Sequence, residues 1–164
     1  MVILGIDPGL ATLGYGVIRS EGDRCQLIQF GVLTTAAGQP LPSRLRSVFL
    51  GINQLMDIYK PDEVAFEELF FSKNVTTGMA VSAARGAALA AAATRTEKLF
   101  EYTPMQVKQA MVGYGKADKR QIQQMVKLLL HMDAIARPDD AADALAIALT
   151  HAATGPACCQ FRMK

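Results

Sequence analysis

The segment VILGIDPG, residues 2–9, decides the fold of this 164-residue chain. A short apolar run that ends at Pro-Gly is typical of a buried strand, and it places the carboxylate of Asp7 at the C-terminal end of that strand. Two further apolar runs, residues 14–18 and 26–34, are separated by a turn at residues 21–23. Three consecutive strands with short turns predict an antiparallel meander.

The segments that follow predict a crossover connection. Residues 41–59 carry apolar side chains at helical spacing, and Pro61 ends this helix. Residues 63–68 predict a fourth strand, which a right-handed crossover can place parallel to the first strand, with Glu67 beside Asp7. Further helices are expected at about 76–96, from 104, at about 117–131 and from 138 to about 151, with a fifth strand at 99–102. The expected fold is therefore α/β, with a mixed five-stranded sheet (an antiparallel meander plus parallel strands) flanked by helices.

Length and composition fit a single globular domain. The chain has 51% hydrophobic residues, 20% charged residues and no Trp, which is typical of a folded protein. We expect residues 1–154 to form this domain. Residues 155–164 lack periodicity and predict a flexible C-terminal tail.

Three features predict a cytoplasmic location and no membrane partner. The first residues have neither the basic region nor the long apolar region of a signal peptide. The Ala-rich residues 79–94 are too short and too weakly hydrophobic for a membrane span, so they predict a buried helix. The three cysteines lack the spacing of a zinc site and are odd in number, which suits a reducing compartment.

Charge is distributed unevenly along the chain. The net charge is +2, but residues 71–130 contain nine Lys and Arg against three acids, which gives +6 there and −4 elsewhere. This pattern fits a protein that binds a polyanion with one region and cations with another. Charge count alone favours a normally solvated surface.

Four acids lie in apolar surroundings, where a carboxylate is costly to place: Asp7, Glu67, Asp140 and Asp143. Asp140 and Asp143 would share one helix face, with Cβ atoms about 5 to 6 Å apart. Four carboxylates that meet would raise one another's pKa unless divalent cations neutralised them, and oxygen ligands select Mg²⁺, with Mn²⁺ as a substitute. Two ions about 3.5 to 4 Å apart can activate water and stabilise the leaving oxygen of a phosphodiester. The pattern predicts metal-assisted phosphodiester hydrolysis.

Taken singly, some of these acids have simpler interpretations. Acids in the first turn of a helix, such as Asp139 and Asp140, are favoured by the helix dipole. Asp7 before Pro-Gly can be a turn residue. Asp143 lies deeper in an apolar helix and is harder to explain in this way. The hydrolase hypothesis therefore depends on the four acids together.

Five strings that span nearly the whole chain resemble the signatures of the RuvC-type Holliday-junction resolvases, in the same order. They are GIDPG at 5–9, GYGVI at 14–18, FEELF at 66–70, QVKQ at 106–109 and DAADALAIA at 140–148, the last followed by Thr150-His151. The resemblance implies an RNase H-like fold and a crossover-junction endodeoxyribonuclease that makes paired symmetric nicks in recombination and repair. It also implies that Asp7, Glu67, Asp140 and Asp143 are the catalytic ligands of two Mg²⁺ ions, and it selects Asp140 over Asp139 and Glu67 over Glu68.

The same resemblance implies contacts with four-way junction DNA. It places Phe70 at the aromatic position that stacks on a junction base, an interaction worth about 1 to 3 kcal/mol. Lys108 and Lys119 match family positions for contacts with phosphates. Three further cations of the basic segment are candidates of the same kind, although solvated surface residues would look no different: Lys116, Lys73 and Arg85.

Paired nicks in a junction of near two-fold symmetry need two equivalent sites, so a homodimer is expected. The small side chains of residues 80–93 permit close helix contact, either in the core or across the dimer. A branch-migration motor partner is implied by the resemblance. The alternatives are an RNase H-type nuclease that acts on RNA–DNA hybrids and a junction-binding scaffold without catalysis. His151, about 16 Å along the helix from Asp140, is too distant to share its metal and predicts a structural hydrogen bond.

Overall fold

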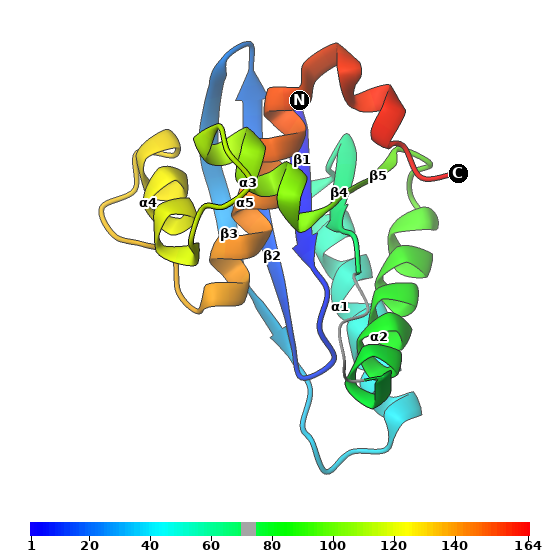
Figure 1. Ribbon diagram of the computed structural model, residues 1–164. Helices are drawn as coiled ribbons and strands as arrows, with labels where there is room; N and C mark the ends of the chain where they lie inside the picture. Colours follow the sequence, from blue (N-terminus) through cyan, green and yellow to red (C-terminus); the bar gives the residue numbers. More distant parts are fainter. Residues whose placement is uncertain (70–74) are drawn as a thin grey trace.

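The computed structural model describes residues 1–69 and 75–164 and contains one mixed sheet. Its strands are β1 (Val2–Asp7), β2 (Thr12–Glu21), β3 (Arg24–Thr34), β4 (Glu63–Glu67) and β5 (Leu99–Tyr102). The order across the sheet is β3-β2-β1-β4-β5 (Figure 1). The first three strands are antiparallel, and β4 is parallel to both β1 and β5. The predicted five-stranded arrangement is therefore confirmed.

Two groups of helices cover the sheet (Figure 1). The helices α1 (Leu41–Tyr59) and α2 (Val75–Ala93) pack on one face, and α3 (Pro104–Val112), α4 (Lys119–Leu129) and α5 (Asp139–Thr154) pack on the other. The starts of α3 and α4 are fixed by capping boxes, in which Thr103 pairs with Gln106 and Asp118 pairs with Gln121.

The position of α5 depends on glycines in the sheet. A Cβ atom at Gly14 would overlap the carbonyl oxygen of Asp140, and one at Gly5 would overlap that of Ala144. Because these positions have no side chain, the α5 backbone approaches the sheet directly and the helix is almost wholly buried. The first turn of α5 is thereby held against the C-terminal end of β1.

The Ala-rich helix α2 is buried along one side only. Ala84, Ala88 and Ala91 are fully buried, whereas Met79 is 67% exposed. The prediction of a buried helix is therefore correct for the face that contacts α1 and the sheet. Along the described part of the chain, no helix is both long enough and apolar enough to cross a bilayer.

Residues 155–164 differ from the loose tail expected from their sequence. They form the 3-10 helix η1 (Gly155–Phe161) and then return to the edge of the sheet, where the amide of Met163 donates to the carbonyl of Leu99 at 2.9 Å. The ring of Phe161 lies 5.0 Å from that of Tyr102. The tail lacks periodicity because a few tertiary contacts, rather than an amphipathic face, hold it in place.

Candidate active site

The parallel pairing of β1 with β4 brings the first two acids together. Ile6 pairs with Phe66, so Asp7 and Glu67 follow at the same edge of the sheet on adjacent strands. Side chains alternate along a strand, and both acids share the face on which Ala65 packs with α5. The prediction that Glu67 lies beside Asp7 is confirmed.

A hydrogen bond joins the carboxyl groups of Asp7 and Glu67. Burial raises the pKa of both carboxyl groups, and the charges of Glu67, Asp143 and Asp140 raise the pKa of Asp7 further. The hydrogen bond between the two side chains raises the pKa of Asp7 and lowers that of Glu67, so Asp7 donates and Glu67 accepts. Carboxyl groups that resist ionisation together are typical of a functional site.

The start of α5 contributes the other two acids from above the sheet. Burial raises the pKa of Asp143, while the Lys119 ammonium opposes this shift. Nζ of Lys119 lies 2.9 Å from Oδ2 of Asp143, so a cation already lies against the acidic cluster. Lys119 is the first residue of α4, whose start is fixed by the Asp118 cap.

The four acids interact electrostatically without forming a finished ligand cage. In residues 1–69 and 75–164, no group of three or more carboxylate, imidazole or thiol side chains is arranged to hold a metal ion. The Asp143 carboxylate is paired with Lys119, and the Asp7 carboxyl group is hydrogen-bonded to Glu67. The donor chemistry still fits Mg²⁺, which usually takes only one or two carboxylates and completes its shell with water and phosphate oxygens.

A cavity of about 260 Å³ lies beside the acids. Glu67 and Asp143 line it together with Lys108 and Lys119, and the rest of its wall is mainly apolar. Two of the acids and two of the lysines selected from the sequence therefore meet at one cavity. This arrangement suits a phosphate that is bound on one side by a cation held by the carboxylates and on the other side directly by the lysine ammonium groups.

Asp139 has a different environment from Asp140. Its carboxylate accepts a hydrogen bond from Nε2 of Gln123 at 3.0 Å and pairs with Arg137 and Lys119. These partners lower the pKa of Asp139 against the opposing effect of desolvation. Three partners thus occupy the Asp139 carboxylate on the outer side of the site, whereas the charge of Asp140 acts on Asp7.

The remaining DNA-contact candidates fall into three situations. Lys116 is exposed in the loop between α3 and α4. Arg85 is mostly buried, and its guanidinium is held by Glu101 and by a backbone carbonyl, so it does not offer a free cation to a phosphate. Phe70 and Lys73 lie outside the described residues.

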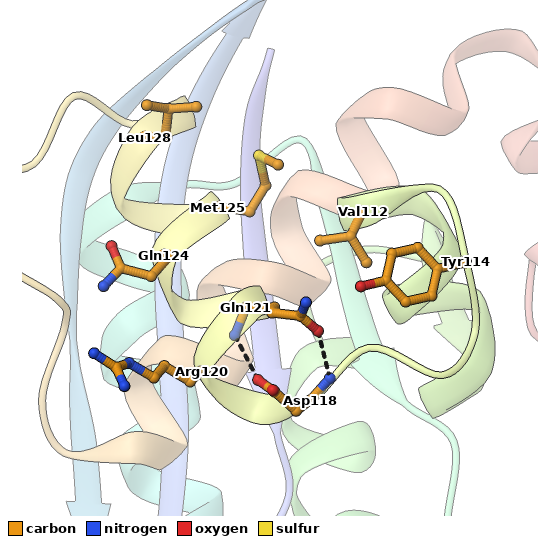
Figure 2. A pocket seen from close by; sticks show the side chains of 8 residues that line it. All are labelled: Val112, Tyr114, Asp118, Arg120, Gln121, Gln124, Met125 and Leu128. Atoms are coloured by element: carbon orange, nitrogen blue, oxygen red, sulfur yellow. Dashed lines mark hydrogen bonds between the residues drawn. The ribbon is translucent and has the colours of Figure 1, made fainter.

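A second cavity, of about 640 Å³, lies away from the acids along the outer side of α4 (Figure 2). Two of its polar residues, Asp118 and Gln121, are hydrogen-bonded to each other's backbone in the capping box, and Tyr114 and Leu128 stand at its margins. The acid of this cavity is thus committed to helix structure. We therefore assign the chemistry to the smaller cavity.

At the far end of α5, His151 makes the structural hydrogen bonds expected of it. Nε2 of His151 lies 2.6 Å from Oε2 of Glu63, and Nδ1 lies 2.7 Å from the hydroxyl of Tyr102. A carboxylate only accepts, so Nε2 carries the proton and Nδ1 accepts from Tyr102. The three side chains connect α5 to β4 and β5.

Sequence reasoning assigned no part in the site to the glycines or to Glu101. The signal for the glycines was present, since Gly5, Gly14 and Gly16 fall on the sheet face that meets the apolar helix of Asp140. No comparable signal marks Glu101, whose partner Arg85 is sixteen residues away in the chain.

Comparison with known proteins shows which family the chain belongs to. The family model for the crossover junction endodeoxyribonuclease RuvC matches residues 3–151. The RuvC of Alkaliphilus metalliredigens is 50% identical over all 164 residues of both chains. The RuvC of Rubrobacter xylanophilus is 56% identical over 151 residues, which cover 92% of this chain and 84% of the relative.

Solved structures agree with the sequence matches. The RuvC structure of Thermus thermophilus superimposes with a TM-score of 0.87 at 38% identity and covers 94% of this chain and 95% of its own. A second structure of T. thermophilus RuvC, in complex with Holliday junction substrate, gives a TM-score of 0.86 at 36% identity, with 94% of each chain covered. The fold is thus the expected RNase H-like one, and the chain belongs to the RuvC family of crossover junction endodeoxyribonucleases.

Proposed function

We propose that this protein is a structure-selective DNA endonuclease that resolves Holliday junctions by paired symmetric nicks in homologous recombination and DNA repair. One observation carries this proposal: a single cavity is lined by Glu67, Asp143, Lys108 and Lys119. Asp7 lies next to it, beside Glu67. The T. thermophilus relative is described in complex with Holliday junction substrate, which supports the choice of substrate.

Asp7, Glu67, Asp140 and Asp143 would hold Mg²⁺, for which Mn²⁺ can substitute, with two ions expected for each site. When bound, such ions lower the pKa of a water and stabilise the leaving oxygen of the phosphodiester. The raised pKa values of Asp7 and Glu67 fit this role, because a bound cation would offset the burial and the charge repulsion that disfavour their ionised forms. Through these cations the carboxylates would hold one side of the scissile phosphate, and the lysines would hold the other side.

Lys119 has a second task in this scheme. Its ammonium pairs with Asp143 at 2.9 Å. With a divalent ion held at Asp143, the 52% exposed side chain of Lys119 would be available to a phosphate oxygen. Lys108, on the wall of the same cavity, is proposed to contact the adjacent phosphate. Lys116 is proposed as a more distant contact, and the stacking role of Phe70 and a phosphate contact by Lys73 belong to the same proposal.

Two matched nicks require two active sites, so we propose that the protein works as a homodimer in the cytoplasm. The exposed side of α2, which includes Met79, offers a surface for the second subunit. A branch-migration motor complex is the proposed further partner, since it would deliver junctions to the dimer.

A junction-cleavage assay tests the proposal. The wild-type protein is incubated with a synthetic four-way junction, a linear duplex and an RNA–DNA hybrid, each with and without Mg²⁺, beside Asp7→Asn. Symmetric nicks in the junction, present only for the wild-type protein with Mg²⁺, are expected. Preferential cleavage of the hybrid would instead indicate an RNase H-type enzyme, and junction binding without any cleavage would indicate a scaffold.

A further inference from the structure

Arg85 approaches the end of β4 from the face of the sheet opposite to α5. Its helix, α2, packs on the sheet through Ala84 and Ala88, whereas the side chain of Glu67 faces α5. Nε of Arg85 donates to the backbone carbonyl of Glu67 at 3.2 Å. The residue that presents an acid to the site on one face is thus held through its backbone from the other face.

The second contact of Arg85 fixes the direction of this hydrogen bond. Nη2 of Arg85 lies 2.6 Å from Oε2 of Glu101, on β5, the strand next to β4. A guanidinium is a rigid planar fork, so two bonds from different nitrogens determine its orientation. The fork therefore bridges β4 and β5 where β4 reaches its catalytic end.

The exposure of Arg85 separates this role from DNA binding. Its side chain is 17% exposed, compared with 52% for Lys119 beside the acids. A phosphate contact would require Arg85 to give up Glu101 and to leave a largely buried position. The contacts present instead tie the cation to the framework of the sheet.

We propose that Arg85 and Glu101 form a positioning pair, which sets the carboxylate of Glu67 by holding the backbone at the end of β4. This inference rests on the proposed nuclease function. A carboxylate displaced by about 1 Å can lower a rate about a hundredfold, so the pair would affect turnover and metal affinity rather than affinity for the junction.

The test uses Arg85→Lys, Arg85→Gln and Glu101→Gln in the full chain. Cleavage at saturating junction gives kcat, electron paramagnetic resonance of free Mn²⁺ gives metal affinity without DNA, and gel shift in EDTA gives junction affinity. All three variants are expected to lower kcat by about tenfold or more and to weaken Mn²⁺ binding, with junction affinity in EDTA unchanged. Arg85→Lys keeps the charge but loses the fork, so it should not restore kcat.

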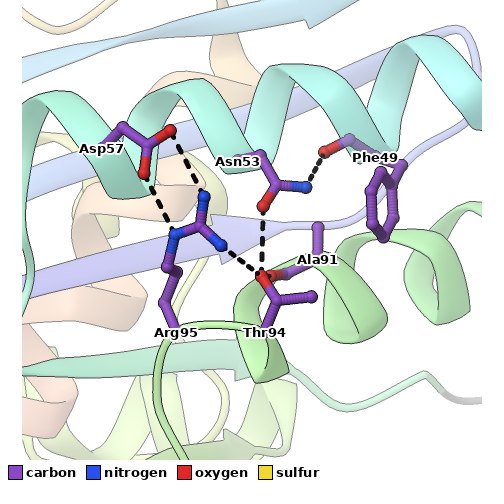
Figure 3. A network of polar contacts seen from close by, with 6 residues as sticks. All are labelled: Phe49, Asn53, Asp57, Ala91, Thr94 and Arg95. Carbon is purple, nitrogen blue, oxygen red and sulfur yellow. Dashed lines mark hydrogen bonds and ion pairs between the residues drawn. The ribbon is translucent and has the colours of Figure 1, made fainter.

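Arg95, which follows the C-terminal end of α2, provides a matched control. It pairs with Asp57 through Nε at 3.0 Å and binds Thr94, which in turn contacts Asn53 (Figure 3). This network joins the end of α2 to α1, away from the end of β4. Arg95→Gln removes an arginine ion pair of the same kind and should leave kcat and Mn²⁺ affinity as in the wild type.

Two outcomes would overturn the positioning pair while leaving the nuclease function intact. One is normal kcat and Mn²⁺ affinity in Glu101→Gln, which retains the arginine itself and is the variant least expected to unfold. The other is weaker junction binding in Arg85→Gln at unchanged kcat, which would return Arg85 to the DNA contacts. Failure of the wild-type protein to cleave junctions would contradict the proposed function itself, and the Mn²⁺ measurements would still test the pair.

Discussion

The ammonium of Lys119 lies 2.9 Å from Oδ2 of Asp143, so the first residue of α4 is an ion-pair partner of an acid one turn into α5. The Lys119 ammonium lowers the pKa of Asp143, and burial raises it. Both helices must hold their relative positions for this pair to persist. The ion pair therefore couples the start of α4 to the acidic site.

Lys119→Gln is expected to move the acidic limb of the pH–rate profile to higher pH. Without the ammonium, the pKa of Asp143 rises further, and a larger fraction of this acid is protonated at a given pH. Cleavage rates measured between pH 5.5 and 9 at fixed Mg²⁺ check the shift. Lys116→Gln, which removes an exposed lysine of the preceding loop, is the control and should lower junction affinity without moving the limb.

Gly14→Ala is expected to push α5 away from the sheet. Its Cβ would overlap the carbonyl oxygen of Asp140, and overpacking of this kind costs about 1 to 3 kcal/mol. Urea denaturation measures the loss in the free energy of unfolding, and Mn²⁺ titration of the folded variant measures the change at the acids. Gly38→Ala, where a Cβ meets no atom within 4 Å, serves as the control. Normal stability and metal affinity in Gly14→Ala would show that α5 does not depend on this contact.

The sheet and the acidic site could be predicted from the sequence because both depend on local pattern. The apolar run before Asp7 marks a strand, and the run before Glu67 marks its parallel neighbour, so the sheet itself places the two acids together. Asp140 and Asp143 follow from helical spacing. Hydrophobic periodicity and short connections carry this information without knowledge of distant contacts.

What the sequence did not predict depends on partners that are not side chains or that are far apart in the chain. Arg85 resembled a DNA-binding cation because its acceptor, the carbonyl of Glu67, leaves no mark in a sequence. The tail at residues 155–164 lacks periodicity, yet Phe161 finds the ring of Tyr102. Lys119 pairs with Asp143 only because α4 and α5 lie side by side, and no local pattern in the sequence predicts that placement.

His151 is expected to make stability depend on pH. Burial lowers the pKa of its imidazole, although Glu63 opposes the shift. The unfolded chain therefore takes up a proton near the ordinary pKa of 6.5, which the folded protein does not take up until a lower pH. This stabilisation is complete above pH 6.5 and is lost as the pH falls below it, by at most about 1.4 kcal/mol per pH unit for one proton.

Urea denaturation of the wild type and of His151→Gln at pH 7.5, 6.5 and 5.5 measures this dependence. The groups that face the imidazole are Tyr102 and Glu63, and Lys98 lies 3.7 Å from the Glu63 carboxylate. The difference in the free energy of unfolding between the two proteins should shrink toward pH 5.5. A constant difference over this range would mean that His151 titrates alike in the folded and unfolded chains.

Asp139→Asn and Asp140→Asn should separate two adjacent acids by function. The Asp139 carboxylate is occupied by Gln123, Arg137 and Lys119, whereas the charge of Asp140 acts on Asp7. Loss of the Asp140 charge is therefore expected to lower junction cleavage by about a hundredfold or more, equal to about 2.7 kcal/mol of transition-state stabilisation. Asp139→Asn should retain most of the activity, because Asn still accepts the hydrogen bond from Gln123. Single-turnover cleavage of a labelled junction gives both rates, and thermal melting verifies that each variant is folded. Equal losses in the two variants would place Asp139 among the metal ligands and remove the distinction that their environments suggest.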